Sequence, residues 1–397
     1  MTARPLEGLR ILDLTRVVAG PFATAILADL GAEVIKIERP KTGDDYRYGP
    51  SKKGETSLSF QNNNRGKASI TLDVRTERGR EIFLRLVEGA DAVVENFRAG
   101  WMAKRGIGPD VIQARNPRCV VASLSGFGQT GPMAGRASYH IVAQATSGFM
   151  AMTGFADGPP VRGGGALGDF VGGLYLTVGI VTALLERERG GPARVLDLSN
   201  QDAMFAVTDS ALTIHEGIGA ETQRLGNQHP FTAPYDALAT KDGHVAIASA
   251  SNRLFRKLCD GIGRPELAED ERYRNHRVRA QHREELNGIF AAWAAGRSCD
   301  EVLAALGPDG ADVPVAKVIR PEEAPGDPQL VARGMVERHA HPSIGEAVFH
   351  GNPIKLSGVA PRARALAPDL GEDTSSVLGA LGLGEDEIEA LREEGVV

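Results

Sequence analysis

The stretch that decides the fold is "LRILDLTRVVAGPFATAILADLGAEVIKIE", residues 9–38 of the 397-residue chain. Its apolar start at residues 9–14 predicts a strand, and residues 21–30 follow with a helical pattern. Residues 33–38 predict a second strand. A strand, a helix and a strand with short connections form a βαβ unit, so this stretch predicts an α/β fold with a parallel sheet.

The same alternation continues along the first half of the chain. Helical and strand-like patterns follow one another over residues 76–88, 91–96, 109–115 and 119–125. Asn96 and Ser125 stand at or just beyond the ends of two of these strands. Because ligands of open α/β sheets bind at the carboxyl edge of the strands, we expect a site at this edge.

The second half of the chain has a different pattern. A helix ending near residue 189, a strand over 193–199 and a helix over 200–215 lead to residues 216–234, whose Gly, Gln, Asn, His and Pro content predicts a linker and loop. The segments that follow predict a small α+β domain with elements at 244–250, 253–261, 279–295, 300–306 and 312–318. The remaining segments are a strand-and-turn region over 335–361 and short helices at 375–381 and 386–394.

Composition and charge exclude several classes of partner. The chain is 42% hydrophobic and 24% charged, as in ordinary globular proteins. Its net charge of -6 gives no general attraction to nucleic acid or anionic lipid, so we expect neither as a partner. The longest apolar stretch, residues 170–185, is interrupted by glycines and is shorter than the roughly 20 residues that span a bilayer, so it indicates a buried helix.

The N-terminal residues lack the apolar segment of a signal peptide, so we expect a cytoplasmic protein. Cys119, Cys259 and Cys299 are far apart in the sequence, which suits a reducing compartment and offers no metal-binding spacing. The histidines form no metal-binding helical pattern, and His339 and His341 alternate as on a strand or loop. We therefore expect no bound metal.

Asp169 stands in the segment "GGGALGDFVGG", residues 163–173, at the start of the long apolar run. Three of the preceding glycines fit the template of a dinucleotide-binding turn, but the proline-broken residues before them do not form the strand that such a turn requires. Asp169 fits two other roles. It is a good N-cap for the helix that follows, and it is also an ionised carboxylate that can act as a nucleophile.

The first strand-to-helix turn lacks the three glycines of a dinucleotide site. Basic residues nevertheless gather near the predicted strand ends. They are Arg16, Lys36, Arg39, Lys67, Arg98, Lys104 and Arg105. Each one alone is typical of a solvated surface. As a set at one sheet edge of an acidic protein, they indicate a ligand with several phosphates and no pair of flat rings, such as coenzyme A.

Several longer blocks resemble a known family. They are "PLEGLRILDLTRVVAGPFATAILADLGAEVIKIERP", "NRGKASITLDVRTERGREIF", "DAVVENFRAG", "NPRCVVASLSGFGQTGP", "GALGDFVGGLY" and the C-terminal "GEDTSSVLGALGLGEDEIEALREEGVV". In this order they resemble signature blocks of the class III CoA-transferases, the CaiB/BaiF family typified by formyl-CoA transferase. The resemblance covers nearly the whole chain.

The resemblance implies an architecture. It implies a large Rossmann-like domain that binds coenzyme A and is built from both chain ends, at residues 1–215 and 330–397. A linker at 216–234 and a smaller α+β domain at 235–329 complete the chain. It further implies a homodimer of interlocked, ring-like subunits, with a coenzyme A thioester and a small carboxylic acid as substrates and no permanently bound cofactor.

The resemblance also implies site residues. The catalytic aspartate of the family matches Asp169. The family's coenzyme A contacts match, by motif, Val17, Ala19, Arg39, Leu72 and Asn96. An arginine often found eight residues after that asparagine is Lys104 here, with Arg105 next to it, so the charge is kept while a bidentate arginine contact is put in doubt.

The chemistry implied by the resemblance is covalent. In the family's scheme the aspartate forms a mixed anhydride with the donor acyl group and releases coenzyme A thiolate, which then attacks the aspartyl carbonyl to give an enzyme-coenzyme A thioester. The acceptor carboxylate repeats the sequence in reverse. Backbone amides near the helix start and the glycine pair, around Gly168, Gly172 and Gly173, are expected to stabilise the oxyanion of each tetrahedral step.

Two other functions fit the same fold. A 2-methylacyl-CoA racemase would use a His-Asp pair, but its histidine aligns with Tyr139, a poor base at pH 7, and His140 is one place along. A non-catalytic coenzyme A-binding protein would have no use for the nucleophile at Asp169.

The acceptor is indicated by the segment "LGNQHPFTAPYDALATKDGHVAIA", residues 225–248. It departs from the glycine run of oxalate-using members and resembles members that move coenzyme A between C4 to C6 dicarboxylates, commonly with succinyl-CoA as donor. His229 or Arg16 is then expected to pair with the distal carboxylate. Asn227 and His229 fit a loop-capping role equally well.

Overall fold

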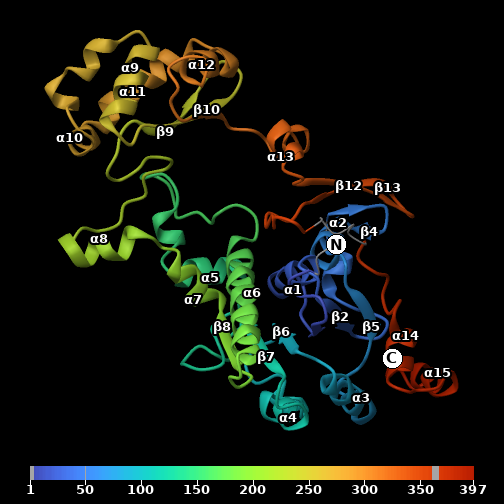
Figure 1. Ribbon diagram of the computed structural model, residues 1–397. Coiled ribbons are helices and arrows are strands. Elements are labelled where there is room, and N and C mark those ends of the chain that lie inside the picture. The colour runs from blue at the N-terminus through green and yellow to red at the C-terminus, as the bar shows by residue number, and fades with distance from the viewer. Residues whose placement is uncertain (1–3, 50, 360–365) are drawn as a thin grey trace. The chain divides into compact units, whose positions relative to one another are not determined.

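The computed structural model describes residues 4–49, 51–359 and 366–397, and Figure 1 shows its elements. The chain forms two compact units. Unit 1 comprises Met1–Met150, Arg162–Gly219 and Pro328–Val397, and unit 2 comprises Ala151–Val161 and Ala220–Asp327. The boundaries expected from the sequence differ from these, because they assign residues 151–161 to the larger domain, set 216–234 apart as a linker and begin the C-terminal part of the larger domain at 330.

Unit 1 is built on a six-stranded sheet. Its strands are β1 (Arg10–Asp13), β2 (Glu33–Glu38), β5 (Ala68–Thr71), β6 (Ala92–Glu95), β7 (Val120–Ser125) and β8 (Val195–Ser199). They lie in the order β5-β2-β1-β6-β7-β8, and every neighbouring pair is parallel. The predicted parallel sheet is therefore confirmed. The order is that of a doubly wound fold, and it reverses between β1 and β6.

Helices cover both faces of this sheet. One face carries α1 (Ala19–Asp29) and α6 (Leu167–Glu188), and the other carries α3 (Glu77–Glu88), α4 (Pro109–Arg115), α14 (Thr374–Ala380) and α15 (Glu385–Glu393). The other helices of unit 1 are α2 (Leu58–Asn64), α5 (His140–Thr146), α7 (Asn200–Ala206), α8 (Ser210–Ile218) and α13 (Pro328–Ala332). Its two hairpins are β3 (Lys52–Lys53) with β4 (Thr56–Ser57), and β12 (Val336–His341) with β13 (Gly345–His350).

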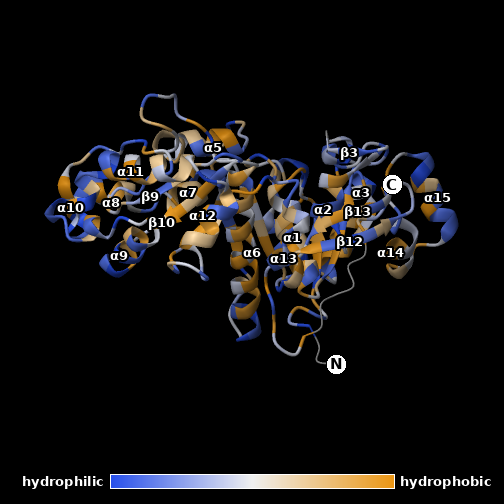
Figure 2. Ribbon diagram, turned by 90° about the horizontal axis from the view of Figure 1, so that it is seen from above, coloured by the Kyte–Doolittle hydropathy of each residue, from blue (hydrophilic) through white to orange (hydrophobic). Residues whose placement is uncertain are grey.

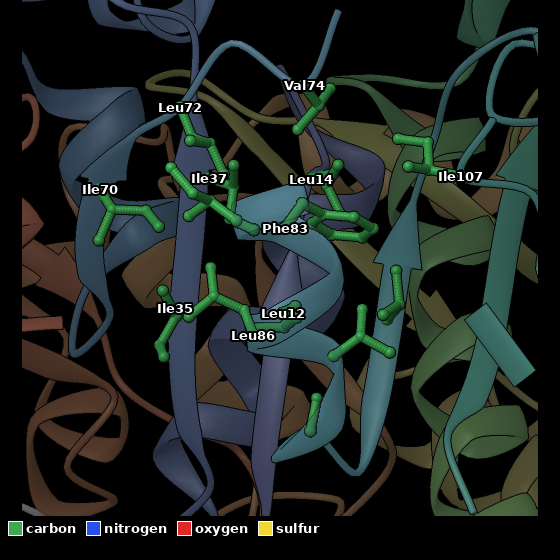
Figure 3. Packing of buried hydrophobic residues seen from close by; sticks show 14 of the residues in the cluster. Leu12, Leu14, Ile35, Ile37, Ile70, Leu72, Val74, Phe83, Leu86 and Ile107 are labelled. Atoms are coloured by element: carbon green, nitrogen blue, oxygen red, sulfur yellow. The ribbon is translucent and has the colours of Figure 1, made fainter. Parts of the chain in front are cut away.

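The two faces of the strands contribute to two separate cores. Because side chains alternate along a strand, Ile11 and Leu12 of β1 belong to different cores. Figure 3 shows the core under α3, where Phe83 and Leu86 lie among side chains of β1 and β2. The opposite core joins β1, β6 and β7 to α1 and α6. Central strands buried on both faces are typical of parallel sheets.

α6 is 22 residues long, and Figure 2 shows it coloured largely as hydrophobic. In the described part of the chain it is the one helix long and apolar enough to cross a membrane. Two of its glycines lie against the backbones of neighbouring helices, Gly173 against the Ala19 carbonyl and Gly168 against His140. A Cβ at either position would press on that backbone, so these glycines allow α6 to pack closely on α1 and α5.

Unit 2 has a three-stranded antiparallel sheet in the order β11-β10-β9. Its elements are β9 (Tyr235–Ala239), β10 (His244–Ala248), β11 (Val315–Lys317), α9 (Asn252–Gly261), α10 (His276–Gln281), α11 (Arg283–Ala295) and α12 (Cys299–Leu306). Its core gathers side chains such as Leu258 and Phe290 from the helices against Val245 and Ile247 of β10.

Two helices expected from the sequence are each divided in two. The helix expected over 200–215 is α7 followed by α8, because Asp209 takes a φ of 53° between them. The helix expected over 279–295 is interrupted at His282, between α10 and α11. The strand-and-turn region expected over 335–361 contains β12 and β13, and its last two residues lie outside the described residues.

Candidate active site

The turn between β1 and α1 lies where the strand order reverses, the position at which open α/β sheets bind ligands. Asn96, directly after β6, ties this turn to the neighbouring strand. Its side-chain oxygen accepts a hydrogen bond from the Arg16 amide at 2.8 Å, and its side-chain nitrogen donates to the Arg16 carbonyl at 2.8 Å. Asn96 therefore fixes the backbone of the turn that faces the site.

Asp169 is the third residue of α6, and the N-cap position belongs to Ala166. The N-cap role considered from the sequence is therefore wrong. No side chain caps this helix, and the Asp169 amide donates to the Ala166 carbonyl at 2.9 Å. Among the described residues, the hydrogen bond to the Asp169 carboxylate comes from Nδ2 of Asn200, at 3.1 Å. The carboxylate is thus not engaged by the amides of its own helix.

Asp169 opens into a cavity of about 420 Å³. The wall of the cavity includes the turn residues Arg16, Val17, Val18 and Ala19, together with Asn96, Ser125, Tyr139 and Asn200. Two buried polar atoms of this wall, Oγ of Ser125 and Oδ1 of Asn200, have no partner among the described residues. Native proteins pair such atoms with water or a ligand. The cavity is therefore suited to a polar group beside Asp169.

Burial raises the pKa of Asp169 from 3.8 to about 6, and the hydrogen bond from Asn200 opposes the rise. The carboxylate is therefore still ionised at pH 7 but more basic than an ordinary aspartate, which favours nucleophilic attack. Asn200 approaches α6 closely, because a Cβ on Gly172 would overlap Oδ1 of Asn200. Gly172 thus makes room for the residue that holds Asp169.

The oxyanion loop expected around Gly168, Gly172 and Gly173 is not a loop, since all three glycines lie inside α6. Only the first four amides of an α-helix lack a partner within the helix, so the amides of Gly172 and Gly173 are already used. The first two amides of α6, those of Leu167 and Gly168, have no partner among the described residues. They are the free backbone donors nearest to Asp169 on this helix.

A second hollow, of about 150 Å³, adjoins the first, because Arg16, Phe97 and Trp101 line both. The rings of Phe97 and Trp101 stack with their centroids 3.9 Å apart. Arg16 lies over the Phe97 ring, and Arg105 lies over the Trp101 ring with Cζ 3.8 Å from its centroid. Alternating cations and rings therefore form a ridge between the two hollows.

The site residues expected from the sequence divide into two groups around this ridge. Arg39, Leu72 and Arg105 line the second hollow, whereas Lys104 is exposed and lines neither.

His229 lies in unit 2, where its Nδ1 accepts a hydrogen bond from the Phe231 amide at 3.1 Å. A hydrogen bond of this kind, to an amide two residues further along the chain, is typical of a side chain that caps a loop. No group of three or more His, Cys, Asp or Glu side chains that could hold a metal occurs in the described part of the chain.

Lys36 and Lys67 are not phosphate-binding residues, contrary to what their place near strand ends indicates. Both side chains are fully buried. Nζ of Lys36 lies 3.0 Å from the Asp44 carboxylate, and Nζ of Lys67 lies 2.8 Å from the Asp13 carboxylate. Their charges are therefore neutralised inside unit 1.

His140 has its ring orientation fixed by Gln144. The Gly163 amide donates to Oε1 of Gln144 at 2.8 Å, so Nε2 of Gln144 faces Nδ1 of His140, 3.2 Å away. This nitrogen can only donate, so Nδ1 is the acceptor and the proton of a neutral His140 lies on Nε2. His140 lines neither hollow. The histidine thus lacks the free lone pair and the position that a racemase base requires.

We expect Asn200→Ala to move the acid limb of the pH profile of kcat/KM above its normal midpoint near pH 6. The Asn200 hydrogen bond lowers the Asp169 pKa, so its loss keeps the carboxyl protonated, and unreactive, to higher pH. We expect kcat/KM at pH 7 to fall by about tenfold. Steady-state rates from pH 5 to 9 measure the effect, and Gln201→Ala is the neighbouring amide control. An unmoved acid limb would argue against this role.

A second buried carboxyl lies beside the ridge. Glu95, at the end of β6, is 3% exposed, and its Oε2 accepts a hydrogen bond from the Phe97 amide at 2.6 Å. Burial raises its pKa from 4.5 to about 7, assisted by Asp197 and opposed by hydrogen bonds from Ser123 and Phe97. The folded protein therefore disfavours the ionised form of Glu95.

We expect Glu95→Gln to stabilise the protein at pH 8 by on the order of 1–3 kcal/mol. Because the pKa is higher in the folded state, the folded protein holds an extra proton between pH 4.5 and 7 and loses stability as the pH rises through this window. Glutamine cannot ionise and keeps the hydrogen-bonding shape. Urea unfolding at pH 4 and pH 8 tests this, and the gain should be absent at pH 4.

A doubly wound α/β sheet therefore carries a half-buried aspartate that faces a cavity at its switch point, the position at which sheets of this class bind ligands. The sequence model of CoA-transferase family III matches residues 6–374, and the chain belongs to this family. It is therefore an enzyme of the CoA-transferase class. The resemblance noted in the sequence blocks is confirmed.

Named relatives span almost the whole chain. The acetyl-CoA:oxalate CoA-transferase of Acetobacter aceti is 41% identical over 376 residues, covering 94% of this chain and 95% of the relative. The succinyl-CoA:glutarate CoA-transferase of Mus musculus is 37% identical, covering 99% and 90%. A crystal structure of a CAIB/BAIF family protein from Brucella suis matches with a TM-score of 0.84 and 36% identity, covering 96% of this chain and 100% of that one.

Proposed function

We propose that this chain transfers coenzyme A from succinyl-CoA, or a similar short acyl-CoA, to a dicarboxylic acid, with Asp169 as the nucleophile. The observation that carries the proposal is the Asp169 carboxylate, which faces a cavity, receives its hydrogen bond from Asn200 and has a pKa raised to about 6. A carboxylate that is free of its own helix can attack a thioester carbonyl. This chemistry requires no metal and no permanently bound cofactor.

The reaction begins when an Asp169 oxygen attacks the thioester carbonyl of the donor. The carbon-sulfur bond breaks, leaving a mixed anhydride on Asp169 and a coenzyme A thiolate. The thiolate then attacks the aspartyl carbonyl, which forms an enzyme thioester and releases the donor acid. The acceptor carboxylate attacks this thioester to form a new anhydride and a thiolate, and the thiolate takes the acceptor acyl group to regenerate Asp169. Water must be excluded throughout, because it would hydrolyse the anhydride.

The two hollows fit a long ligand such as coenzyme A, and unit 1 is then the coenzyme A-binding domain built from both chain ends. Arg39, Leu72 and Arg105 would take the nucleotide end, and the thioester end would reach Asp169 past the Phe97–Trp101 stack. Ala19 is the first residue of α1, and such helix starts offer free amides to phosphate groups.

The free amides of Leu167 and Gly168 are the donors we assign to the oxyanion that forms at each tetrahedral step. Both stand at the positive end of the α6 dipole. This assignment replaces the amides of Gly172 and Gly173, which the helix already uses.

A dicarboxylic acceptor is supported by the charge of the cavity wall. Arg16, Arg98 and Arg136 line the cavity with Asp169, and Arg98 and Arg136 have no ion-pair partner among the described residues. Arg16, whose exposed pair with Asp45 is 3.4 Å long, is the residue we assign to the distal carboxylate. The similarity to the succinyl-CoA:glutarate CoA-transferase favours a five-carbon acceptor. The similarity to the acetyl-CoA:oxalate CoA-transferase keeps oxalate among the candidate acceptors, although the sequence pattern at residues 225–248 disfavours oxalate.

The test incubates the purified protein with succinyl-CoA and single acids: oxalate, malonate, glutarate, mesaconate and a monocarboxylate control. Mass spectrometry then identifies each new coenzyme A ester. We expect transfer to at least one dicarboxylate and much less to the monocarboxylate. Transfer to no acid, with deuterium exchange at C2 of a 2-methylacyl-CoA, would instead establish the racemase. Binding of coenzyme A without either reaction would establish the non-catalytic alternative.

The proposal includes a cytoplasmic homodimer of interlocked subunits. An exposed apolar stripe on α6 supports a subunit interface, since Leu174, Val178 and Leu185 are each about half exposed or more and share one helix face. We expect Val178→Glu to lower the molar mass measured by light scattering to that of one chain. Glu188→Ala, on the same helix, should leave it unchanged. A single-chain mass for the unaltered protein would contradict the dimer.

A further inference from the structure

The turn between β1 and α1 contains a strained residue. Val17 has a φ of 69°, in the left-handed region that β-branched residues rarely adopt. The residue lies in the wall of the cavity that contains Asp169, between Arg16 and Val18. A residue kept in such a conformation requires surroundings that hold it there.

Two buried charges hold this turn. The Val17 amide donates to both carboxylate oxygens of Asp44, at 3.0 and 3.2 Å. Nζ of Lys36 lies 3.0 Å from the same carboxylate and donates to the Thr15 carbonyl at 2.8 Å. Asp44 is 1% exposed and Lys36 is fully buried. This ion pair therefore binds the backbone of the turn on both sides of Arg16, at the Thr15 carbonyl and at the Val17 amide.

A role in stability alone is a weak explanation for this pair. Removing two charges from water is costly, and a buried ion pair often stabilises a fold no better than apolar residues of the same size. Lys36 and Asp44 differ from an ordinary buried ion pair in the backbone groups to which they are hydrogen-bonded. Both side chains bond to the backbone of the turn, and Asp44 also accepts a hydrogen bond from the Tyr46 amide at 2.9 Å.

We infer that the Lys36–Asp44 pair is a positioning device that keeps Val17 in its left-handed conformation, so that the turn is preformed for coenzyme A. The inference rests on the proposed function for the identity of the ligand. Because the Val17 amide is bound to Asp44, Val17 can meet a ligand only through its carbonyl or side chain. The same contacts set where the helix start at Ala19 lies, since Ala19 is only two positions after Val17 in the chain.

A double-mutant cycle tests the inference. Glycine adopts a positive φ without strain, so a turn with Val17→Gly no longer depends on Asp44 to hold it. Calorimetry measures the Kd of coenzyme A for the unaltered protein, Asp44→Asn, Val17→Gly and the double variant. We expect Asp44→Asn to weaken binding by about tenfold when residue 17 is valine and by less than about threefold when it is glycine. An equal loss in both backgrounds, or no loss, overturns the inference.

The control is Asp29→Asn, which removes a largely buried ion pair, Asp29 with Arg65, at the other end of α1. It should leave the Kd unchanged. Should Asp44→Asn fail to fold, the charge-balanced variant Lys36→Gln/Asp44→Asn takes its place in the cycle.

A second measurement separates this inference from the proposed function. Hydrogen-deuterium exchange of peptides covering residues 14–18 requires no ligand. We expect at least about tenfold faster exchange in Asp44→Asn than in Asp29→Asn. Failure of the unaltered protein to bind coenzyme A would refute the proposed function, and the exchange result would still decide whether the pair holds the turn. Equal exchange in both variants overturns the inference.

Discussion

Asp169→Ala is expected to lower the rate of coenzyme A transfer by about 10⁴-fold or more, because it removes the carboxylate that we propose as the nucleophile. Coenzyme A should still bind, since the other residues that line the two hollows remain in place. Intact-mass spectrometry after mixing with succinyl-CoA alone should detect a covalent coenzyme A adduct on the unaltered protein and none on the variant. A variant that retained a tenth of the activity would show that Asp169 does not carry the reaction.

Asp202→Ala is the matched control for this experiment. Asp202 is the third residue of α7, as Asp169 is of α6, so both carboxylates meet the same helix-end environment. Asp202 is exposed and does not line the cavity. If Asp169 only stabilised the start of its helix, Asp169→Ala and Asp202→Ala would have the same effect on transfer activity. We expect Asp202→Ala to keep transfer within about twofold, with at most about 1 kcal/mol lost from the free energy of unfolding.

The loss of Asp169 should also stabilise the fold above pH 6. Its pKa is higher in the folded state than the unfolded value of 3.8, so the folded protein loses stability as the pH rises from 3.8 to about 6. Asp169→Ala removes that loss, and we expect a gain on the order of 1 kcal/mol at pH 8. The enzyme thus keeps a carboxylate in a place that disfavours its charge, as expected of a reactive group.

The parallel sheet is predictable from the sequence because its signals are local. β2 and α4 have the bounds that their patterns predict, and β1 and β6 begin within one residue of theirs. α2 was not predicted, because its residues are mostly polar. Gln61 is nevertheless buried there, with hydrogen bonds to the backbone of Ala367, about 300 residues further along the chain. Such partners are not visible in a local pattern.

The site was predictable only in part, because some of its residues also depend on contacts that a local sequence pattern does not show. Asp169 and Asn96 stand in recognisable blocks, whereas Asn200, the residue that binds Asp169, was not predicted. The signal was present, since Asn200 directly follows β8, as Asn96 follows β6, and polar residues after parallel strands face the ligand edge. Lys36 and Lys67 also lie near strand ends, but their charges are neutralised by Asp44 and Asp13, and the sequence pattern does not show these pairings.

Those neutralised charges form one buried network. Three cations, Lys36, Lys67 and Arg47, face three carboxylates, Asp44, Asp13 and Glu38, at distances of 2.7 to 3.0 Å. The charges therefore balance. Burial opposes ionisation of Asp13, but the charges of Lys67 and Lys36 outweigh it and lower the Asp13 pKa to about 2. Because this pKa lies below the unfolded value of 3.8, the stabilisation is fully present above pH 4 and is lost as the pH falls toward 2.

Asp13→Ala is therefore expected to lower the free energy of unfolding at pH 7 by about 3–5 kcal/mol, because it leaves one buried positive charge without a partner. Urea denaturation followed by circular dichroism measures the change. Glu394→Ala removes a carboxylate from an exposed pair with Arg78 and should cost less than about 1 kcal/mol. Asp13→Ala/Lys67→Met restores the balance of charge and should recover part of the loss. If the double variant were less stable than Asp13→Ala, packing and hydrogen bonds at these positions, rather than charge balance, would account for the stability of the network.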